Sequence, residues 1–84
     1  MVTVLFFASL RESLGTSREL VALAGPGTTV AALVETLRAR EGPWAEAFAP
    51  GRNWRVAVNQ QMASLATALR AGDEVAFFPP VTGG

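Results

Sequence analysis

Only one long stretch of this chain has the apolar spacing of an amphipathic helix, which limits the folds open to it. Its apolar residues recur at i, i+3, i+4 and i+7, as Val30, Leu33, Val34 and Leu37. This spacing places them on one helical face. Thr28 or Thr29 is the expected N-cap, Arg40 falls in the last turn, and the Gly42–Pro43 pair stops the helix. Because one helix must bury its stripe against another element, the rest of the chain should form a sheet.

Several short segments have the composition of β-strands. They are rich in β-branched or aromatic residues and are bounded by turn residues, and they cover residues 2–8, 17–23, 54–59 and 74–78. Residues 59–61 resemble a hairpin turn that leads into a short strand from Met62. Both faces of segment 2–8 are apolar, so we expect that strand at the centre of the sheet.

Two short helical turns complete the pattern. Ser9 is placed to cap a helix that ends at Gly15, and residues 44–48 are expected to close over the core. The sequence therefore predicts an α+β fold, in which a small mixed sheet carries one main helix on one face. We expect a domain over residues 1–78 and an extended tail over residues 79–84.

Composition excludes several functions. The 84 residues contain no His, Cys, Lys or Tyr, and seven Arg balance seven acidic residues. The chain therefore lacks most proton shuttles, strong nucleophiles and zinc ligands, which argues against a self-sufficient enzyme and a metal site. The Arg residues are scattered, which argues against nucleic-acid binding. No apolar run is long enough to span a membrane, so we expect a cytoplasmic protein that does not contact membranes.

The last six residues carry the most distinctive chemistry: Pro79, Pro80, Val81, Thr82, Gly83 and Gly84. The prolines favour a stiff exit from the sheet, and glycines fit a narrow channel in another protein. The terminal carboxylate becomes an acyl donor once a partner adenylates it with ATP. Gly84 is thus the predicted reactive residue, and residues 79–83 are the predicted inserted segment. The alternative is a Gly-rich end without a function.

Three blocks of sequence are specific enough to suggest a family: residues 4–8 with 10–12, residues 58–60, and residues 72–84. Together they resemble the small-subunit family of molybdopterin synthase, ubiquitin-like sulfur carriers with the β-grasp fold. The resemblance spans the whole chain. Its last block is the most specific, because the Gly-Gly ending alone is shared with ubiquitin and with the thiamine-pathway sulfur carrier.

The resemblance implies a mechanism and a set of partners. An adenylyltransferase of the ubiquitin-activating type would adenylate Gly84, and a sulfurtransferase would convert the adenylate to a thiocarboxylate. The tail would then enter the large subunit of the synthase, which supplies the catalytic side chains. There the sulfur would pass to a cyclic pyranopterin precursor in two rounds. The family forms a heterotetramer of two large and two small subunits, with no permanently bound cofactor and with ATP used by the activating partner.

Alternation along the strands also predicts a docking surface. It assigns four apolar side chains to the helix-facing core: Val4, Phe6, Val75 and Phe77. Phe7 and Phe78 then share the opposite face, where Met62 can join them and Arg11 can flank them. In the resembled family this region contacts the large subunit and the activating enzyme. The alternative is that Phe7 and Phe78 pack under a loop or are exposed singly.

Two other functions remain open at this level. The chain could be a protein modifier, or a sulfur carrier for thiamine synthesis or tRNA thiolation, because these proteins share the fold and the Gly-Gly end. It could also be a β-grasp interaction module with an inert tail. The acceptor of the activated terminus distinguishes these functions from the first.

Overall fold

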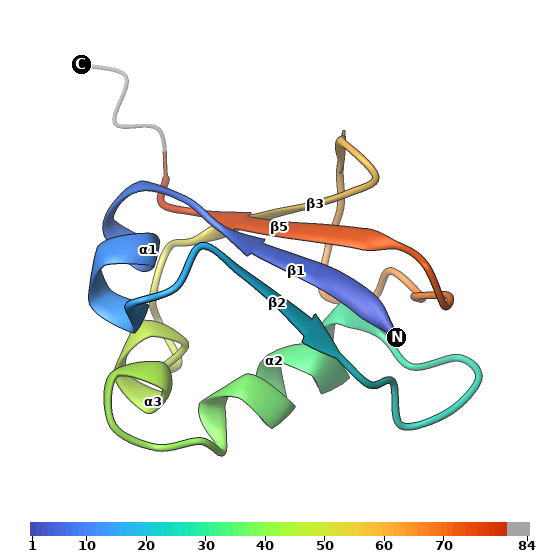
Figure 1. The fold of residues 1–84 in the computed structure, drawn as a ribbon, viewed down its shortest axis with the longest axis horizontal. Helices are drawn as coiled ribbons and strands as arrows, with labels where there is room; N and C mark the ends of the chain where they lie inside the picture. Colours follow the sequence, from blue (N-terminus) through green and yellow to red (C-terminus); the bar gives the residue numbers. More distant parts are fainter. Residues whose placement is uncertain (81–84) are drawn as a thin grey trace.

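A five-stranded mixed sheet with helices on one side forms the protein (Figure 1). The computed structural model describes residues 1–80. The elements follow the order β1 (Val2–Phe6), α1 (Ala8–Leu14), β2 (Arg18–Val21), α2 (Val30–Arg38), α3 (Pro43–Ala47), β3 (Arg55–Val58), β4 (Gln61–Met62) and β5 (Glu74–Phe78). The sheet order is β2-β1-β5-β3-β4, with β1 and β5 parallel and the other pairs antiparallel. The predicted α+β architecture is confirmed. Within residues 1–80, the helices are too short and too polar to cross a bilayer.

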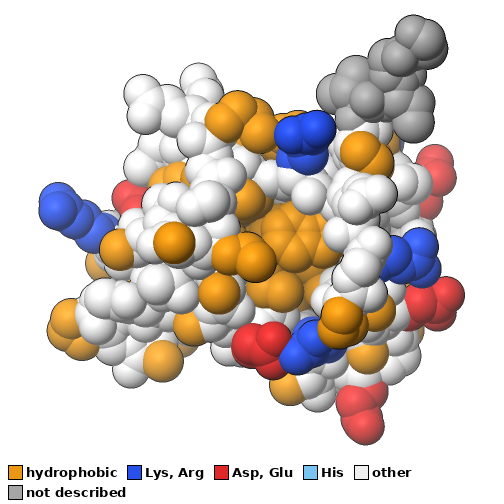
Figure 2. Space-filling model, turned by 180° about the vertical axis from the view of Figure 1, so that it is seen from behind, with side chains coloured by type: hydrophobic (Ala, Val, Ile, Leu, Met, Phe, Trp, Pro, Cys, Tyr) orange, Lys and Arg blue, Asp and Glu red, His pale blue; other side chains and the backbone are white. Residues whose placement is uncertain are grey.

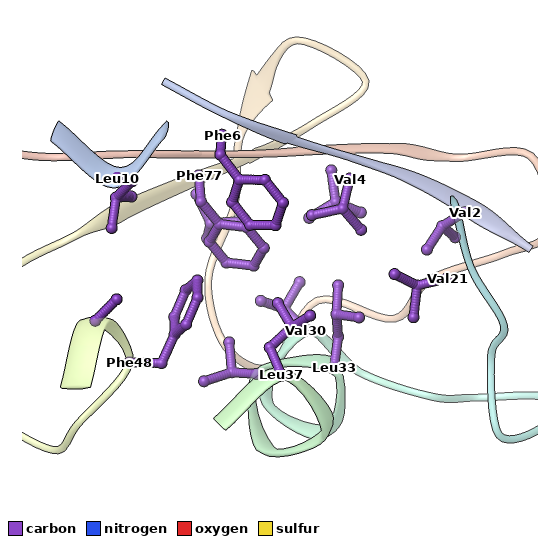
Figure 3. Packing of buried hydrophobic residues seen from close by; sticks show 14 of the residues in the cluster. Val2, Val4, Phe6, Leu10, Val21, Val30, Leu33, Leu37, Phe48 and Phe77 are labelled. Carbon is purple, nitrogen blue, oxygen red and sulfur yellow. The ribbon is translucent and has the colours of Figure 1, made fainter. Parts of the chain in front are cut away.

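The core lies between the sheet and α2. Phe6 pairs in register with Phe77, and Val4 with Val75, so all four side chains point to the same face. Figure 3 shows Phe6, Phe77 and Val4 directed from the sheet toward Leu33 and Leu37 of α2. The predicted stripe of α2 is buried throughout, as are the four core residues assigned by alternation. Segment 2–8 does supply an inner strand, because β1 lies between β2 and β5.

The start of α2 is held by more than its N-cap. The hydroxyl of Thr29 accepts the Ala32 N–H at 3.3 Å, as the sequence predicts. The Val30 and Ala31 N–H groups donate to the carbonyls of Thr67 and Leu65, both at 2.9 Å. These donors would otherwise lack partners at a helix N-terminus. The loop before β5 is therefore fixed to α2 by backbone hydrogen bonds.

The first helix begins earlier than expected. Ser9 lies inside α1, and Phe7 is the N-cap residue without a side-chain hydrogen bond. The cause is the backbone of Ala8, whose φ of 51° turns the chain directly after Phe7. The Leu10 N–H then reaches the Phe7 carbonyl at 3.1 Å. At the other end Gly15 adopts the left-handed conformation predicted for it, with φ of 72°.

The main helix also ends earlier than expected. α2 stops at Arg38, and beyond it Glu41 and Gly42 have φ values of 64° and 57°, outside the right-handed helical region. Pro43 therefore opens α3, where its missing N–H costs nothing. Arg40 lies beyond α2, against the expectation that it sits in the last turn. Its guanidinium donates to the Glu19 carboxylate at 2.7 Å and lies 4.5 Å from the centre of the Trp44 ring.

Hydrogen bonds between polar groups connect two turns at the hairpin end of the sheet. We call Asn59 and Asp73, which make these bonds, the polar clasp. Asn59 and Gln60 have φ values of 51° and 68°, as the tight β3–β4 turn requires. The Asn59 amide donates to Asp73 at 3.0 Å and accepts the Glu74 N–H at 3.0 Å. Asp73 also accepts the Arg70 N–H at 2.9 Å. The clasp thus ties the β3–β4 turn to the turn that precedes β5.

Asp73 should make the stability of the fold depend on pH. Hydrogen bonds from the Arg70 backbone and then the Asn59 side chain lower the pKa of Asp73 from its usual 3.8. Because the folded pKa lies below the unfolded pKa, this stabilisation is present above pH 3.8 and is lost as pH falls through the folded pKa. We expect Asp73→Asn to reduce the acid dependence of the melting temperature, measured from neutral to strongly acidic pH. An identical acid dependence in the variant and the wild type would contradict this role.

Candidate functional site

The tail leaves the domain from an inner strand. β5 is hydrogen-bonded to β1 on one side and to β3 on the other, and its Val75 and Phe77 side chains are fully buried. Half-buried Pro79 and exposed Pro80 follow Phe78. Proline has no N–H to donate, so the ladder ends here. The other predicted tail residues lie outside the described residues: Val81, Thr82, Gly83 and Gly84.

Phe7 and Phe78 lie on the sheet face opposite the core. Phe6 and Phe77 are paired in register and point into the core, so the extended residues that follow them point away. The Phe7 N–H donates to the Phe77 carbonyl at 3.1 Å, which holds the two strand ends together. Phe7 is 46% exposed and Phe78 is half-buried. Of the described helices, α2 and α3 lie on the other side of the sheet (Figure 1).

Met62 and Arg11 lie to either side of this pair. Met62 is in register with Ala57, and Ala57 with Ala76, so all three face the same side as Phe78. Met62 is 63% exposed. Arg11 is exposed on α1, one turn after Phe7, whose carbonyl accepts the Arg11 N–H at 3.4 Å. We call the surface formed by Phe7, Arg11, Met62 and Phe78 the docking face.

Sequence reasoning missed two apolar residues at the centre of the same sheet face. Leu5 of β1 and Ala76 of β5 are in register with one another, and both are partly exposed. Ala76 lies midway between Glu74 and Phe78 on β5. The signal for them was present, because the alternation that assigned Phe6 and Phe77 to the core also assigns Leu5 and Ala76 to the other face. With these residues the apolar surface continues across β1 and β5.

The surroundings of Pro80 are shallow and combine apolar with polar side chains. Within residues 1–80, no group of three or more acidic side chains is placed to hold a metal ion. The pocket at the root of the tail, which Pro80 lines with Leu10 and Trp54, has a volume of about 150 Å³. This one pocket is therefore smaller than the roughly 300–1,000 Å³ that is usual for drug-sized ligands. An apolar face beside the exit of the tail is instead typical of a protein-binding surface.

Comparisons with known proteins agree with this description. Residues 4–84 match the ThiS family. The molybdopterin synthase sulfur carrier subunit of Escherichia coli is 49% identical, and that of Haemophilus influenzae is 43% identical, each over all of this chain and all of the relative. Among solved structures, SAMP1 of Haloferax volcanii is 32% identical with a TM-score of 0.80, covering 99% of this chain and 98% of that one. These likenesses confirm the predicted β-grasp fold.

Proposed function

Because the chain belongs to the ThiS family, together with sulfur carrier subunits of molybdopterin synthase, we propose that it is such a carrier. The observation that supports this most strongly is the match at 49% identity along the whole chain, tail included. The described geometry agrees, because the tail leaves an inner strand beside an apolar docking face. In this proposal the chain carries sulfur on its terminus and contributes no catalytic side chain.

Activation takes place at Gly84. A carboxylate oxygen attacks the α-phosphorus of ATP in the active site of an adenylyltransferase, and pyrophosphate leaves. Hydrosulfide supplied by a sulfurtransferase then attacks the acyl carbon, AMP leaves, and loss of the proton from sulfur gives the thiocarboxylate. The chain binds no permanent cofactor, and the ATP belongs to the activating partner. The lack of Cys is compatible with this route, because sulfur is carried on the terminus.

Transfer follows in the large subunit of the synthase. Pro79, Pro80, Val81, Thr82 and Gly83 enter its channel and bring the thiocarboxylate to a cyclic pyranopterin precursor. Two rounds of transfer build the dithiolene, within an assembly of two large and two small subunits. Gly83 and Gly84 carry no side chain, so the channel can be narrow. We place this chemistry in the cytoplasm.

Reconstitution tests the proposal directly. The chain is incubated with the adenylyltransferase, ATP and the sulfurtransferase, and its intact mass is followed by mass spectrometry. The expected change is replacement of one oxygen by sulfur. Addition of the large subunit and the cyclic precursor should then return the original mass and yield the dithiolene product. A chain that gains sulfur but passes none to the precursor would exclude the proposed acceptor.

Protein modification is the second candidate. The structure of SAMP1, a small archaeal modifier protein, supports it with 32% identity and a TM-score of 0.80. The higher identity to the synthase subunits favours the first candidate. Sulfur carriage for thiamine synthesis or tRNA thiolation is a further alternative within the same chemistry. Incubation of the activated chain with a cell extract distinguishes protein modification from sulfur carriage, because a modifier would appear in covalent conjugates of higher mass.

The docking face should contribute most of the affinity for the large subunit. Loss of a buried aromatic anchor typically costs more than ~2 kcal/mol of binding. We therefore expect Phe78→Ala to weaken this complex by at least about thirtyfold, measured by calorimetric titration. The melting temperature should change little, because Phe78 is outside the core cluster.

A matched variant controls for general loss of apolar surface. Leu20 is 60% exposed on the same sheet face but on β2, the edge strand two positions away from β5, so Leu20→Ala should weaken binding far less than Phe78→Ala. If Phe78→Ala melted early yet bound normally while folded, Phe78 would be a core residue and the face assignment would be inverted.

A further inference from the structure

A second apolar surface lies around the edge of the sheet from the docking face. Figure 2 views the molecule from behind and shows hydrophobic side chains at the bottom of a hollow. Between β3 and the segment that follows β4, a groove has a volume of about 270 Å³. We call it the Trp54 groove; its apolar lining consists of Trp54, Val56, Met62, Ala63 and Leu65. Two of these side chains are largely solvent-exposed, Met62 at 63% and Leu65 at 50%.

Both walls of the groove are held rigidly. On one wall Trp54 packs edge-on against Phe48 and Phe77, with ring centroids 5.6 and 5.3 Å apart. On the other, the Ala63 N–H donates to the Val56 carbonyl at 3.0 Å, and the Leu65 carbonyl accepts the Ala31 N–H at 2.9 Å. The loop that carries Leu65 is therefore attached to α2 through its backbone, while the Leu65 side chain is 50% exposed. A groove that is already formed loses little conformational entropy when a ligand enters it.

The charged residues at the rim have one sign. Arg52 and Arg55 line the groove, and no acidic side chain does. Arg52 is partly engaged, since it donates to the Glu46 carbonyl at 3.2 Å and lies 3.8 Å from the Glu46 carboxylate. Arg55 is exposed and makes no ion pair with any residue of the described part of the chain. The rim therefore complements an acidic ligand.

The groove is continuous with the docking face. Met62 belongs to both surfaces, and Arg55 is the register partner of Phe78 on the neighbouring strand. A protein that covers Phe78 and Met62 thus reaches the groove without a gap. We propose that the Trp54 groove takes one large apolar side chain, next to an acidic residue, from the same large subunit that receives the tail. This inference rests on the proposed function and specifies how the partner is recognised.

Paired substitutions test the groove with the large subunit as the probe. Leu65→Ser and Arg55→Glu should each weaken binding at least about tenfold in calorimetric titration. Leu65→Ser removes an apolar contact with the partner, and Arg55→Glu removes the attraction to its acidic residue. Their matched controls lie away from the groove: Leu20→Ser on the far edge strand β2 and Arg38→Glu on α2, which covers the other side of the sheet, should stay within about twofold of the wild type. Only the effect of Arg55→Glu should shrink at high salt, because charge attraction is screened there. Affinities of Leu65→Ser and Arg55→Glu equal to the wild type would overturn the proposal.

A second measurement does not depend on variants. The chain is labelled with fluorotryptophan, and fluorine NMR follows its Trp44 and Trp54 resonances during titration with the large subunit. We expect the Trp54 resonance to shift at saturation, while Trp44, which packs on Phe6 beneath Arg40, serves as the internal control. An unmoved Trp54 resonance in a saturated complex that still transfers sulfur would overturn the groove alone. Absence of any complex with the wild type would instead overturn the proposed function.

Discussion

A chain that lacks Gly84 should acquire no sulfur and support no synthase turnover, while its fold remains unchanged. Adenylation requires a terminal carboxylate at the right distance from the domain, and the length of the tail determines that distance. The last strand ends at Phe78, and the core residues all precede it, so the melting temperature should equal that of the wild type. Intact-mass measurement after incubation with the activating enzymes gives the first result, and circular dichroism gives the second.

An extra residue after Gly84 should have the same effect as the deletion. It moves the carboxylate out of register with the adenylating site and places an amide where the carboxylate should be. The matched control is an extra residue before Met1, which should leave sulfur loading unchanged. If the chain extended beyond Gly84 gained sulfur without being trimmed, the terminal carboxylate of Gly84 would not be the reactive group.

The largest loss of stability is expected for Phe77→Ala. Phe77 is fully buried, and its ring lies 6.2 Å from Phe6, 5.2 Å from Phe48 and 5.3 Å from Trp54, measured between centroids. Truncation of a buried Phe typically costs about 3–5 kcal/mol. A small domain has a free energy of unfolding of roughly 5–15 kcal/mol, so this variant should be near the threshold of folding. Denaturant unfolding followed by circular dichroism measures the change.

The adjacent residue provides the control for this prediction. Phe78 has the same side chain on the same strand but points to the other face and is only half-buried. Phe78→Ala should therefore reduce the free energy of unfolding far less than Phe77→Ala. Equal losses in the two variants would show that the alternation of β5 does not separate the core from the docking face.

Local patterns in the sequence were sufficient to predict most of the elements. The i, i+3, i+4, i+7 stripe identified the buried face of α2, and alternation assigned Phe6 and Phe77 to the core. The order of residue types in the tail identified the family, and the comparisons confirmed it. These features depend on neighbours in the sequence, so one chain contains enough information to predict them.

Contacts between distant segments could not be predicted in this way. The ion pair of Arg40 with Glu19 and its stacking on Trp44 depend on the path of the chain after α2, where Glu41 and Gly42 have positive φ values. The Leu65 carbonyl that accepts an N–H of α2 belongs to a loop without any periodic pattern. The Trp54 groove is made by that loop and β3, so no motif in the sequence indicates it.

The position of β5 between two strands has a mechanical consequence. A partner that grips the tail would pull on the carboxyl end of β5, along the axis of the strand. Since β5 is bonded to β1 and β3 over its length, that force loads both ladders in shear, with many hydrogen bonds sharing it. A tail attached to an edge strand would load only one ladder. The two ladders together should therefore keep the domain folded under a larger pull on its carboxyl end than one ladder could.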